Sequence, residues 1–192
     1  MGFVSVLGYA QQLVKERVQT GDQTIDATIG NGNDTLCLAE LVGPRGLVYG
    51  FDVQKTAIEN TRERFAKASR VIDHVRLILD SHANMATYIP EDKHGQIAAI
   101  MFNLGYLPGA DESVITHTNS TLVALDAALA LLRPRGIITV VLYPGHDGGD
   151  AEASAVQQWA ESLPPELYQV LMYRFANKHE RAPYLLAIEK RK

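Results

Sequence analysis

The most constraining feature of this chain is the block Thr24–Thr35, which reads Thr-Ile-Asp-Ala-Thr-Ile-Gly-Asn-Gly-Asn-Asp-Thr. It runs from apolar residues into the acid Asp26, turns through Gly30 and Gly32, and enters a stretch of helical character. Glycines in such a strand-to-helix turn let the backbone approach a ligand closely. A second apolar run, Val48–Asp52, follows at the distance of a strand–helix–strand unit and also ends in an acid. The two blocks predict a nucleotide-type cofactor site on an open α/β sheet.

The positions of the acids indicate which cofactor suits this turn. The dinucleotide pattern G-x-G-x-x-G puts a pyrophosphate at the helix N-terminus, but Thr35 replaces its third glycine, and a pyrophosphate would meet Asp26 and Asp34. Carboxylates attract a ligand that carries an ammonium and a sulfonium, so S-adenosylmethionine is favoured over NAD. Asp52 is placed to accept hydrogen bonds from both ribose hydroxyls. The alternatives are that the turn is only structural and that Asp34 caps the helix.

Length and composition predict a single domain over residues 1–192, because 46% hydrophobic content suffices for one sheet core. The sole cysteine, Cys37, excludes an intrachain disulfide, and no Cys/His spacing suggests a metal site. No apolar run approaches about 18 residues and no leader pattern opens the chain, so a cytoplasmic location without membrane contact is expected. The net charge of −4 argues against nonspecific nucleic-acid binding but allows a local RNA-binding patch.

Hydrophobic periodicity predicts alternating strands and helices. Apolar residues at helical spacing indicate an amphipathic helix near 3–19 that covers the sheet. Continuous apolar runs predict parallel strands, buried on both faces, at 23–29, 46–52, 74–79, 96–102 and 136–142. Further helices are expected near 33–41, 54–68, 83–88, 112–132 and 150–162.

The carboxyl-terminal part of the chain departs from this alternation. The apolar runs 167–174 and 184–189 are joined by a loop too short for a parallel crossover, so they are expected to form an antiparallel hairpin. The predicted fold is therefore a Rossmann-like, mostly parallel sheet of seven strands with helices on both faces. If the first hairpin strand runs parallel with the sheet, loop 175–183 emerges at the carboxyl ends of the strands, where open α/β sheets bind ligands.

The hairpin loop and its border hold the best local basic cluster of the chain. Its members are expected to contact RNA phosphates, with solvated surface charge as the alternative. They are Arg174, Lys178, His179 and Arg181.

Five blocks of the chain together resemble one known group: residues 21–28, 30–35, 48–52, 102–109 and 143–149. On these blocks the chain is similar, over nearly its full length, to the rRNA methylase family of class I S-adenosylmethionine-dependent methyltransferases, whose characterised members are the MnmM-type tRNA methyltransferases. The last two blocks, with Asn-Leu-Gly-Tyr-Leu-Pro-Gly and Tyr-Pro-Gly-His-Asp-Gly-Gly, are the specific ones.

The resemblance implies methylation of the exocyclic amine of 5-aminomethyl-(2-thio)uridine at the tRNA wobble position. The anticodon stem-loop is then the substrate, and a homodimer is expected. Amino-methyltransferases with Asn/Asp-Pro-Pro-Tyr carry prolines where this chain has Leu104 and Gly105. The departure leaves open how far their base-clamping geometry transfers. Alternative functions are methylation of rRNA or of a small amine, and a noncatalytic scaffold that binds the cofactor or RNA.

Asn103, Tyr106 and His146 are the residues expected to act on the substrate. Asn103 closes the fourth predicted strand, and its side-chain oxygen, or the Leu104 carbonyl, can accept N–H groups and hold an amine in line with the methyl donor. An alkylamine is largely protonated at neutral pH, so a proton must leave before attack. His146 is the favoured proton acceptor or substrate-orienting group, with bulk water as the alternative. Tyr106 and Tyr143 are expected to stack on a splayed uridine, with core packing as the alternative.

Asp80 follows the third predicted strand, where class I enzymes contact adenine. It is expected either to accept from the adenine amino group or to cap the next helix. The complete expected cofactor site comprises Asp26, Thr28, Gly30, Asn31, Gly32, Asn33, Asp34, Thr35, Asp52, Val53, Gln54, Asp80, Ser81, His82, Asn103 and Leu104.

Overall fold

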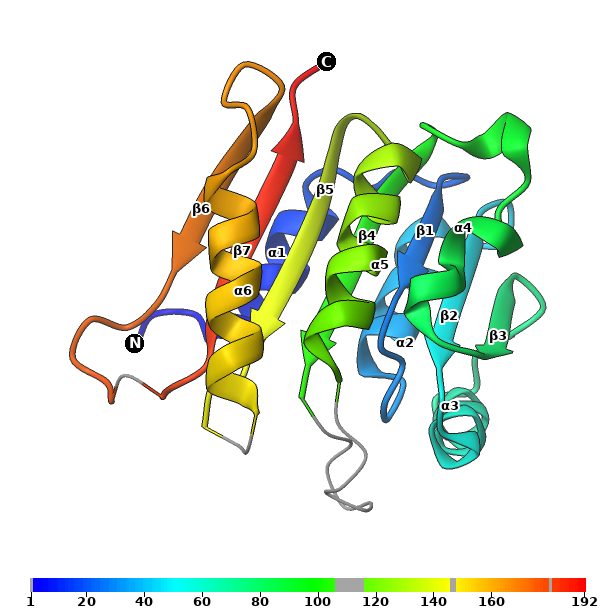
Figure 1. The fold of residues 1–192 in the computed structure, drawn as a ribbon. Helices are drawn as coiled ribbons and strands as arrows, with labels where there is room; N and C mark the ends of the chain where they lie inside the picture. Colours follow the sequence, from blue (N-terminus) through cyan, green and yellow to red (C-terminus); the bar gives the residue numbers. More distant parts are fainter. Residues whose placement is uncertain (1, 106–115, 146–147, 180) are drawn as a thin grey trace.

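Seven strands form one sheet in the order β3-β2-β1-β4-β5-β7-β6 (Figure 1). The computed structural model describes residues 2–105, 116–145, 148–179 and 181–192. Neighbouring strands are parallel except that β7 runs antiparallel to both β5 and β6. The strands are β1 (Gln23–Asp26), β2 (Leu47–Asp52), β3 (Val75–Leu79), β4 (Ile97–Leu104), β5 (Leu132–Leu142), β6 (Tyr168–Tyr173) and β7 (Tyr184–Lys190). The predicted fold class, with its carboxyl-terminal antiparallel hairpin, is confirmed.

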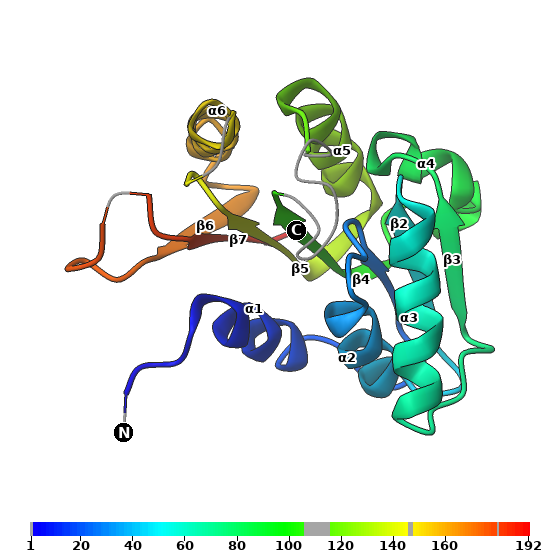
Figure 2. The ribbon, with the colours of Figure 1, turned by 90° about the horizontal axis from the view of Figure 1, so that it is seen from below.

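Helices cover both faces of the sheet, as Figure 2 shows from the edge at which the parallel strands end. One face carries α1, α2 and α3, and the other carries α4, α5 and α6. The helices are α1 (Val6–Lys15), α2 (Asn33–Val42), α3 (Lys55–Lys67), α4 (Met85–Tyr88), α5 (Thr118–Leu131) and α6 (Gly149–Glu161), with single 3₁₀ turns η1 (His82–Asn84) and η2 (Glu91–Lys93). No helix in the described ranges is long and apolar enough to cross a membrane.

Helix α1 is shorter than the predicted 3–19 at both ends: it ends at Lys15, and a cap defines its start. The Ser5 hydroxyl accepts a hydrogen bond from the Gly8 amide at 3.1 Å, which satisfies one of the free N–H groups of the first turn. Helix α5 begins at Thr118, after the non-helical Thr116 and His117. Residues 112–115, with which the predicted helix opens, lie outside the described part of the chain. Strand β1 ends at Asp26 rather than at 29, because the chain already turns there toward Gly30.

Strand β5 begins earlier than predicted and with an irregular stretch. Leu132 pairs with Ile97 and Ile137 pairs with Ala99, so β5 carries extra residues between these two pairs. The stretch contains Pro134, which has no N–H for a ladder, and Arg135, which adopts a φ of 61°. From Ile137 onward the pairing with β4 is regular.

The two faces of β4 enter two separate apolar clusters. Ile100, Phe102 and Leu104 pack with the α5 side, whereas Ala99 and Met101 pack with the α1 and α2 side. Because side chains alternate along a strand, Asn103 follows Met101 and lies toward α1 and α2. The polar side chain of Asn103 therefore lies at the carboxyl end of β4, on the face that α1 and α2 cover.

Candidate functional site

A cavity of about 860 Å³ lies where β1, β2, β3 and β4 end. This volume is in the range of about 300–1,000 Å³ typical of small-molecule sites, and the position is the one expected for an open α/β sheet. The predicted site residues that line it are Thr28, Gly30, Asn31, Asn33, Asp34, Asp52, Val53, Gln54, Asp80, Ser81, His82, Asn103 and Tyr143.

The glycine-rich turn after β1 has the backbone conformation that its sequence requires. Gly30 and Gly32 have φ values of 54° and 73°, which side-chain-bearing residues rarely adopt. A Cβ on Gly32 would also lie 2.5 Å from the Thr61 hydroxyl oxygen of α3. The second glycine therefore lets the turn pack directly against α3.

Asp52 binds the same turn from the end of β2. Its Oδ2 accepts from the Gly30 amide and its Oδ1 accepts from the Gln54 amide, both at 2.9 Å. Burial raises the pKa of this carboxyl, and the backbone N–H groups oppose the rise. The carboxylate is thus held at the cavity wall with lone pairs left for further donors.

Asp26 lies beneath the turn rather than in the cavity. It is fully buried, accepts from the Thr35 hydroxyl at 2.6 Å and accepts from the Thr28 amide at 3.2 Å. Burial, followed by the nearby charge of Asp34, raises the pKa of Asp26 to about 7. Four of the predicted cofactor residues are absent from the described cavity wall: Asp26, Gly32, Thr35 and Leu104. Asp26 and Thr35 instead support the turn from behind.

The raised pKa of Asp26 predicts a pH-dependent stability. The folded state prefers the protonated acid, so the Asp26 contribution is favourable at low pH and is lost as pH rises from about 4 through about 7. Asp26→Asn should therefore raise the free energy of unfolding more at pH 8 than at pH 5. The difference between the two effects should be roughly 1–3 kcal/mol. Urea unfolding of the ligand-free protein at both pH values measures this difference. The exposed Asp73→Asn serves as control, and an equal effect of Asp26→Asn at both pH values would contradict the prediction.

Asn103 reaches the cavity together with Asp34 and Gln11. The Asn103 Nδ2 donates to Asp34 Oδ2 at 2.6 Å, and Gln11 Nε2 donates to Asp34 Oδ1 at 2.7 Å. The buried Asn103 Oδ1 has no hydrogen-bond partner among the described residues. Asp34 does not cap α2, whose N-cap is Gly32, so the capping alternative for Asp34 is wrong. All three side chains line the cavity.

In the turn after β3, the residue that caps the next helix is Ser81 and not Asp80. Ser81 caps η1, because its hydroxyl accepts from the Ala83 amide at 3.2 Å. Asp80 accepts from the Tyr88 hydroxyl, the Ser81 amide and the Asn84 side chain, and these hydrogen bonds lower the pKa of its carboxyl. The carboxylate is therefore held on the cavity wall by its own turn.

His82 is buried at the inner side of the same turn, with 8% of its surface exposed. Its Nδ1 lies 3.2 Å from the Ala27 carbonyl, which assigns the proton to Nδ1 and leaves Nε2 as an acceptor. Nε2 has no partner within the described ranges. Burial lowers the pKa of His82, which favours the neutral ring.

Tyr143 lies half-buried in the cavity wall at the end of β5, and burial, followed by the Asp34 charge, raises the pKa of its hydroxyl. It is thus on the same wall as Asn103. The other two predicted substrate residues at this edge, Tyr106 and His146, lie outside the described residues.

The hairpin loop emerges at the carboxyl ends of the strands, because β6 runs parallel to β5. Its predicted cations are exposed and do not line the cavity. Lys178 Nζ lies 4.9 Å from the centre of the Phe175 ring, and Arg181 approaches Asp150 at 3.5 Å. The four predicted phosphate contacts, Arg174, Lys178, His179 and Arg181, are therefore at the edge of the sheet that carries the cavity.

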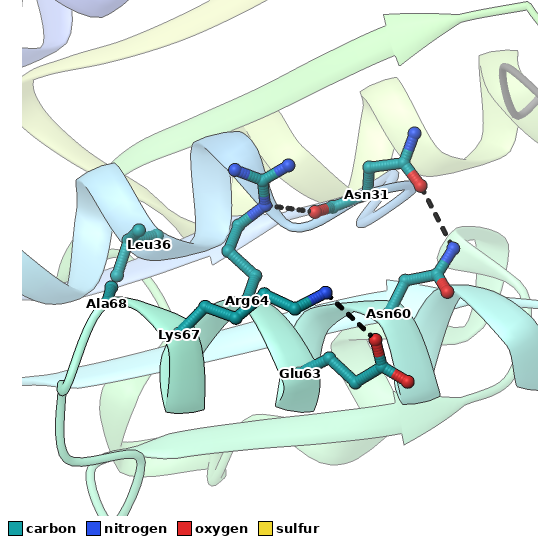
Figure 3. Close-up of a pocket in the computed structure, with 7 residues that line it drawn as sticks. All are labelled: Asn31, Leu36, Asn60, Glu63, Arg64, Lys67 and Ala68. Atoms are coloured by element: carbon teal, nitrogen blue, oxygen red, sulfur yellow. Dashed lines mark hydrogen bonds and ion pairs between the residues drawn. The ribbon is translucent and has the colours of Figure 1, made fainter.

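A second cavity of about 510 Å³ lies behind the glycine-rich turn, between α2 and α3 (Figure 3). Asn31 borders both cavities. From α3, Arg64 Nε donates to the Asn31 carbonyl and Asn60 Nδ2 donates to Asn31 Oδ1 at 3.0 Å. These contacts hold the turn against α3.

Sequence reasoning missed part of the cavity wall. The missed residues are Leu7, Gln11, Ala27, Ile29, Phe51, Gly105, Thr116, His117 and Ser120. Two of them, Leu7 and Gln11, belong to α1, and their only sequence signal was that α1 packs on the sheet. Ala27, Ile29, Phe51 and Gly105 lie within the predicted sequence blocks, Thr116 and His117 precede α5, and Ser120 lies in its first turn.

Comparison with known proteins identifies relatives of this architecture. The family model described as "Putative rRNA methylase" matches residues 48–189. A curated relative, tRNA (mnm(5)s(2)U34)-methyltransferase, chloroplastic, of Arabidopsis thaliana, is 39% identical over 91% of this chain. The chain spans 65% of the length of that relative.

Solved structures extend the similarity to the whole fold. A Clostridium thermocellum structure described as a "putative rRNA-methylase" is 42% identical, with a TM-score of 0.93 and coverage of 99% of this chain and 100% of the other. A Streptococcus mutans structure described as a "putative methyltransferase" in complex with S-adenosylhomocysteine (SAH) is 35% identical, with a TM-score of 0.87 and coverage of 98% and 99%. The resemblance seen in the sequence blocks is confirmed, and the chain belongs to the rRNA methylase family.

Proposed function

We propose that this protein is an S-adenosylmethionine-dependent enzyme that methylates the aminomethyl group of 5-aminomethyl-(2-thio)uridine at the tRNA wobble position. The observation that carries the proposal is the buried Asn103 Oδ1, which has no hydrogen-bond partner in the described part of the chain and belongs to the same cavity wall as the Asp52 carboxylate. One group suits an amine N–H, and the other suits ribose hydroxyls. The Arabidopsis relative, a tRNA (mnm(5)s(2)U34)-methyltransferase, and the SAH-bound Streptococcus mutans structure support the assignment.

The cavity fits the cofactor in size and in chemistry. Asp52 retains acceptor capacity for the ribose, and the turn at Asp80 and His82 offers acceptors to the adenine amino group. Asp34 adds a negative charge to the cavity wall, which favours a cofactor that carries an ammonium and a sulfonium. When bound, the cofactor supplies an electrophilic methyl group on its sulfonium.

We infer that the residues on the substrate side of the cavity act by orienting the substrate amine. Asn103 Oδ1 accepts an N–H of the amine and so directs the nitrogen lone pair, and a reaction of bound partners gains most from such orientation. Tyr143, which lines the same cavity, supplies an aromatic ring for stacking on a splayed base. The amine must lose a proton first, and we assign its removal to His146 or to bulk water. Tyr106 as a second stacking residue stays a prediction.

We assign RNA binding to the exposed cations of the hairpin loop. Replacing Arg174, Lys178 and Arg181 together by alanine should weaken tRNA binding and make it less dependent on salt, because fewer counterions are released. Cofactor affinity should not change, since none of these side chains lines the cavity. Filter binding at several salt concentrations measures both quantities.

The matched control for this variant removes Arg191 and Lys192, which are exposed beyond the opposite end of the hairpin. It should leave the salt slope unchanged. A wild-type slope in the triple variant would place the RNA-binding surface elsewhere.

Mass spectrometry of nucleosides tests the proposed function directly. tRNA that carries 5-aminomethyl-(2-thio)uridine is incubated with the protein and with methyl-labelled S-adenosylmethionine. We expect label in the methylaminomethyl nucleoside and none in rRNA treated in parallel. Equal methylation of the free modified nucleoside would instead identify a small-amine methyltransferase, and the absence of any label would favour a noncatalytic scaffold. The homodimer and the cytoplasmic location stay predictions.

A further inference from the structure

We propose that Gln11 and Asp34 are positioning residues, which fix the Asn103 amide so that its oxygen faces the substrate amine. The inference rests on the proposed function, because it assumes that an N–H-bearing nucleophile enters the cavity. It assigns to Asp34 a positioning role in addition to its attraction for the charged cofactor, and it gives α1 a part in the reaction.

The three side chains form a continuous hydrogen-bonded chain across three elements. Gln11 of α1 donates to one oxygen of Asp34 at 2.7 Å, and Asn103 of β4 donates to the other oxygen at 2.6 Å. Asp34 belongs to the first turn of α2 and is buried. The alternation of β4 puts Asn103 on the side of the sheet that α1 and α2 cover. The hydrogen bonds among Gln11, Asp34 and Asn103 therefore follow from the alternation of side chains along β4 and from the packing of α1 and α2 on that face.

The carboxylate decides which way the Asn103 amide points. An amide has a donor end and an acceptor end of nearly equal size, so shape alone does not select one orientation. A carboxylate only accepts, and an inverted Asn103 would bring its Oδ1 against Asp34 Oδ2 at hydrogen-bond distance. The charge-assisted N–H···O contact thus leaves Oδ1 as the end that remains unpaired in the described structure.

Gln11 in turn holds the carboxylate. Helix α1 is anchored by Ala10, Leu13 and Val14, which are buried against the sheet. From this fixed helix the Gln11 side chain occupies the Asp34 oxygen that Asn103 does not use. Loss of this donor frees the Asp34 side chain to rotate. Asp34 then no longer holds the Asn103 amide in one orientation.

The orientation has a consequence for the substrate class. A fixed acceptor favours nucleophiles that carry an N–H and disfavours groups that present only lone pairs. An inverted amide would present Nδ2 and reverse this preference. Gln11 and Asp34 therefore contribute to the choice of an amine as methyl acceptor.

Kinetics on substituted proteins provide the first test. Asp34→Asn keeps the shape but can pair with either end of Asn103, and Gln11→Met keeps the length but removes the donor. At saturating cofactor, the single-turnover rate on tRNA with 5-aminomethyl-(2-thio)uridine should fall by about 30-fold and about fivefold, respectively. Gln12→Ala, an exposed neighbour on α1, is the control and should keep the wild-type rate. Normal rates at saturating cofactor with only weaker cofactor binding would overturn the proposal and make Asp34 a cofactor ligand.

A double substitution separates positioning from independent effects. If Asp34 acts through Asn103, then Asp34→Asn should cost little further rate in an Asn103→Ala background. A full additional loss would overturn the proposal.

The side-chain amide resonance of Asn103 gives a readout that does not need activity. In ¹⁵N-labelled ligand-free protein this signal is assigned by its loss in Asn103→Ala. We expect slow hydrogen exchange in the wild type and in Gln12→Ala, and at least tenfold faster exchange in Asp34→Asn and Gln11→Met. Fast exchange in the wild type would overturn the proposal. Protected exchange without methylation of any tRNA would instead mean that the proposed function has failed while the orientation of Asn103 stands.

Discussion

Alanine in place of Asn103 should lower the single-turnover methylation rate by about 100-fold and change cofactor affinity by no more than about twofold. On the proposed assignment, Asn103 Oδ1, which has no partner among the described residues, accepts from the substrate amine, so its removal affects the aligned complex more than cofactor binding. An interaction of this kind reduces kcat and kcat/KM together. Rapid-quench measurement of labelled tRNA, with calorimetric titration of the cofactor, provides both numbers.

A matched control for this variant is Gln96→Ala, which precedes the opposite end of the same strand. It should leave both quantities at wild-type values. If Asn103→Ala methylates at the wild-type rate, Asn103 does not orient the amine.

Alanine in place of Asp52 should weaken S-adenosylmethionine binding by at least about tenfold. Each charge-assisted hydrogen bond to a ribose hydroxyl contributes roughly 1.5–3 kcal/mol, so the loss of one already predicts about 10–150-fold weaker binding, and the loss of both predicts a larger effect. The substitution also removes the acceptors of the Gly30 and Gln54 amides and so loosens the turn. Isothermal titration of the folded variant measures the change.

Asp52→Asn offers a graded comparison, since it keeps one acceptor oxygen and should bind with intermediate affinity. The exposed Asp73→Ala controls for the loss of one negative charge. Wild-type affinity in folded Asp52→Ala would remove the ribose assignment.

Much of the fold could be predicted because local patterns carry it. Continuous apolar runs and helical spacing located every strand of the sheet, and the short loop required the antiparallel hairpin. The observed ends of helices and strands differ from the predicted ones where the conformation of a single residue decides them. Examples are the cap at Ser5 and the irregular backbone at Arg135. Such effects depend on backbone angles that a hydrophobic pattern does not contain.

The candidate site was predictable for the residues at the carboxyl ends of strands. Asp52 and Asn103 are examples, because strand ends meet at one edge of the sheet. Gln11 was not predictable, since the angle at which α1 crosses the sheet decides which of its side chains reaches Asp34. The burial of Asp26 was missed for a related reason: the sequence shows an acid after an apolar run but not that the turn folds over it.

The irregular start of β5 has a consequence for how sequences of this family can diverge. Extra residues between Leu132 and Ile137 lie outside the regular ladder, so an insertion or deletion there leaves the partners of β4 unchanged. From Ala99 to Asn103 the ladder is regular, and a change of one residue would turn Asn103 to the opposite side of the sheet, away from Asp34. Homologues should therefore vary in length at 133–136 and keep a constant length between Ala99 and Asn103.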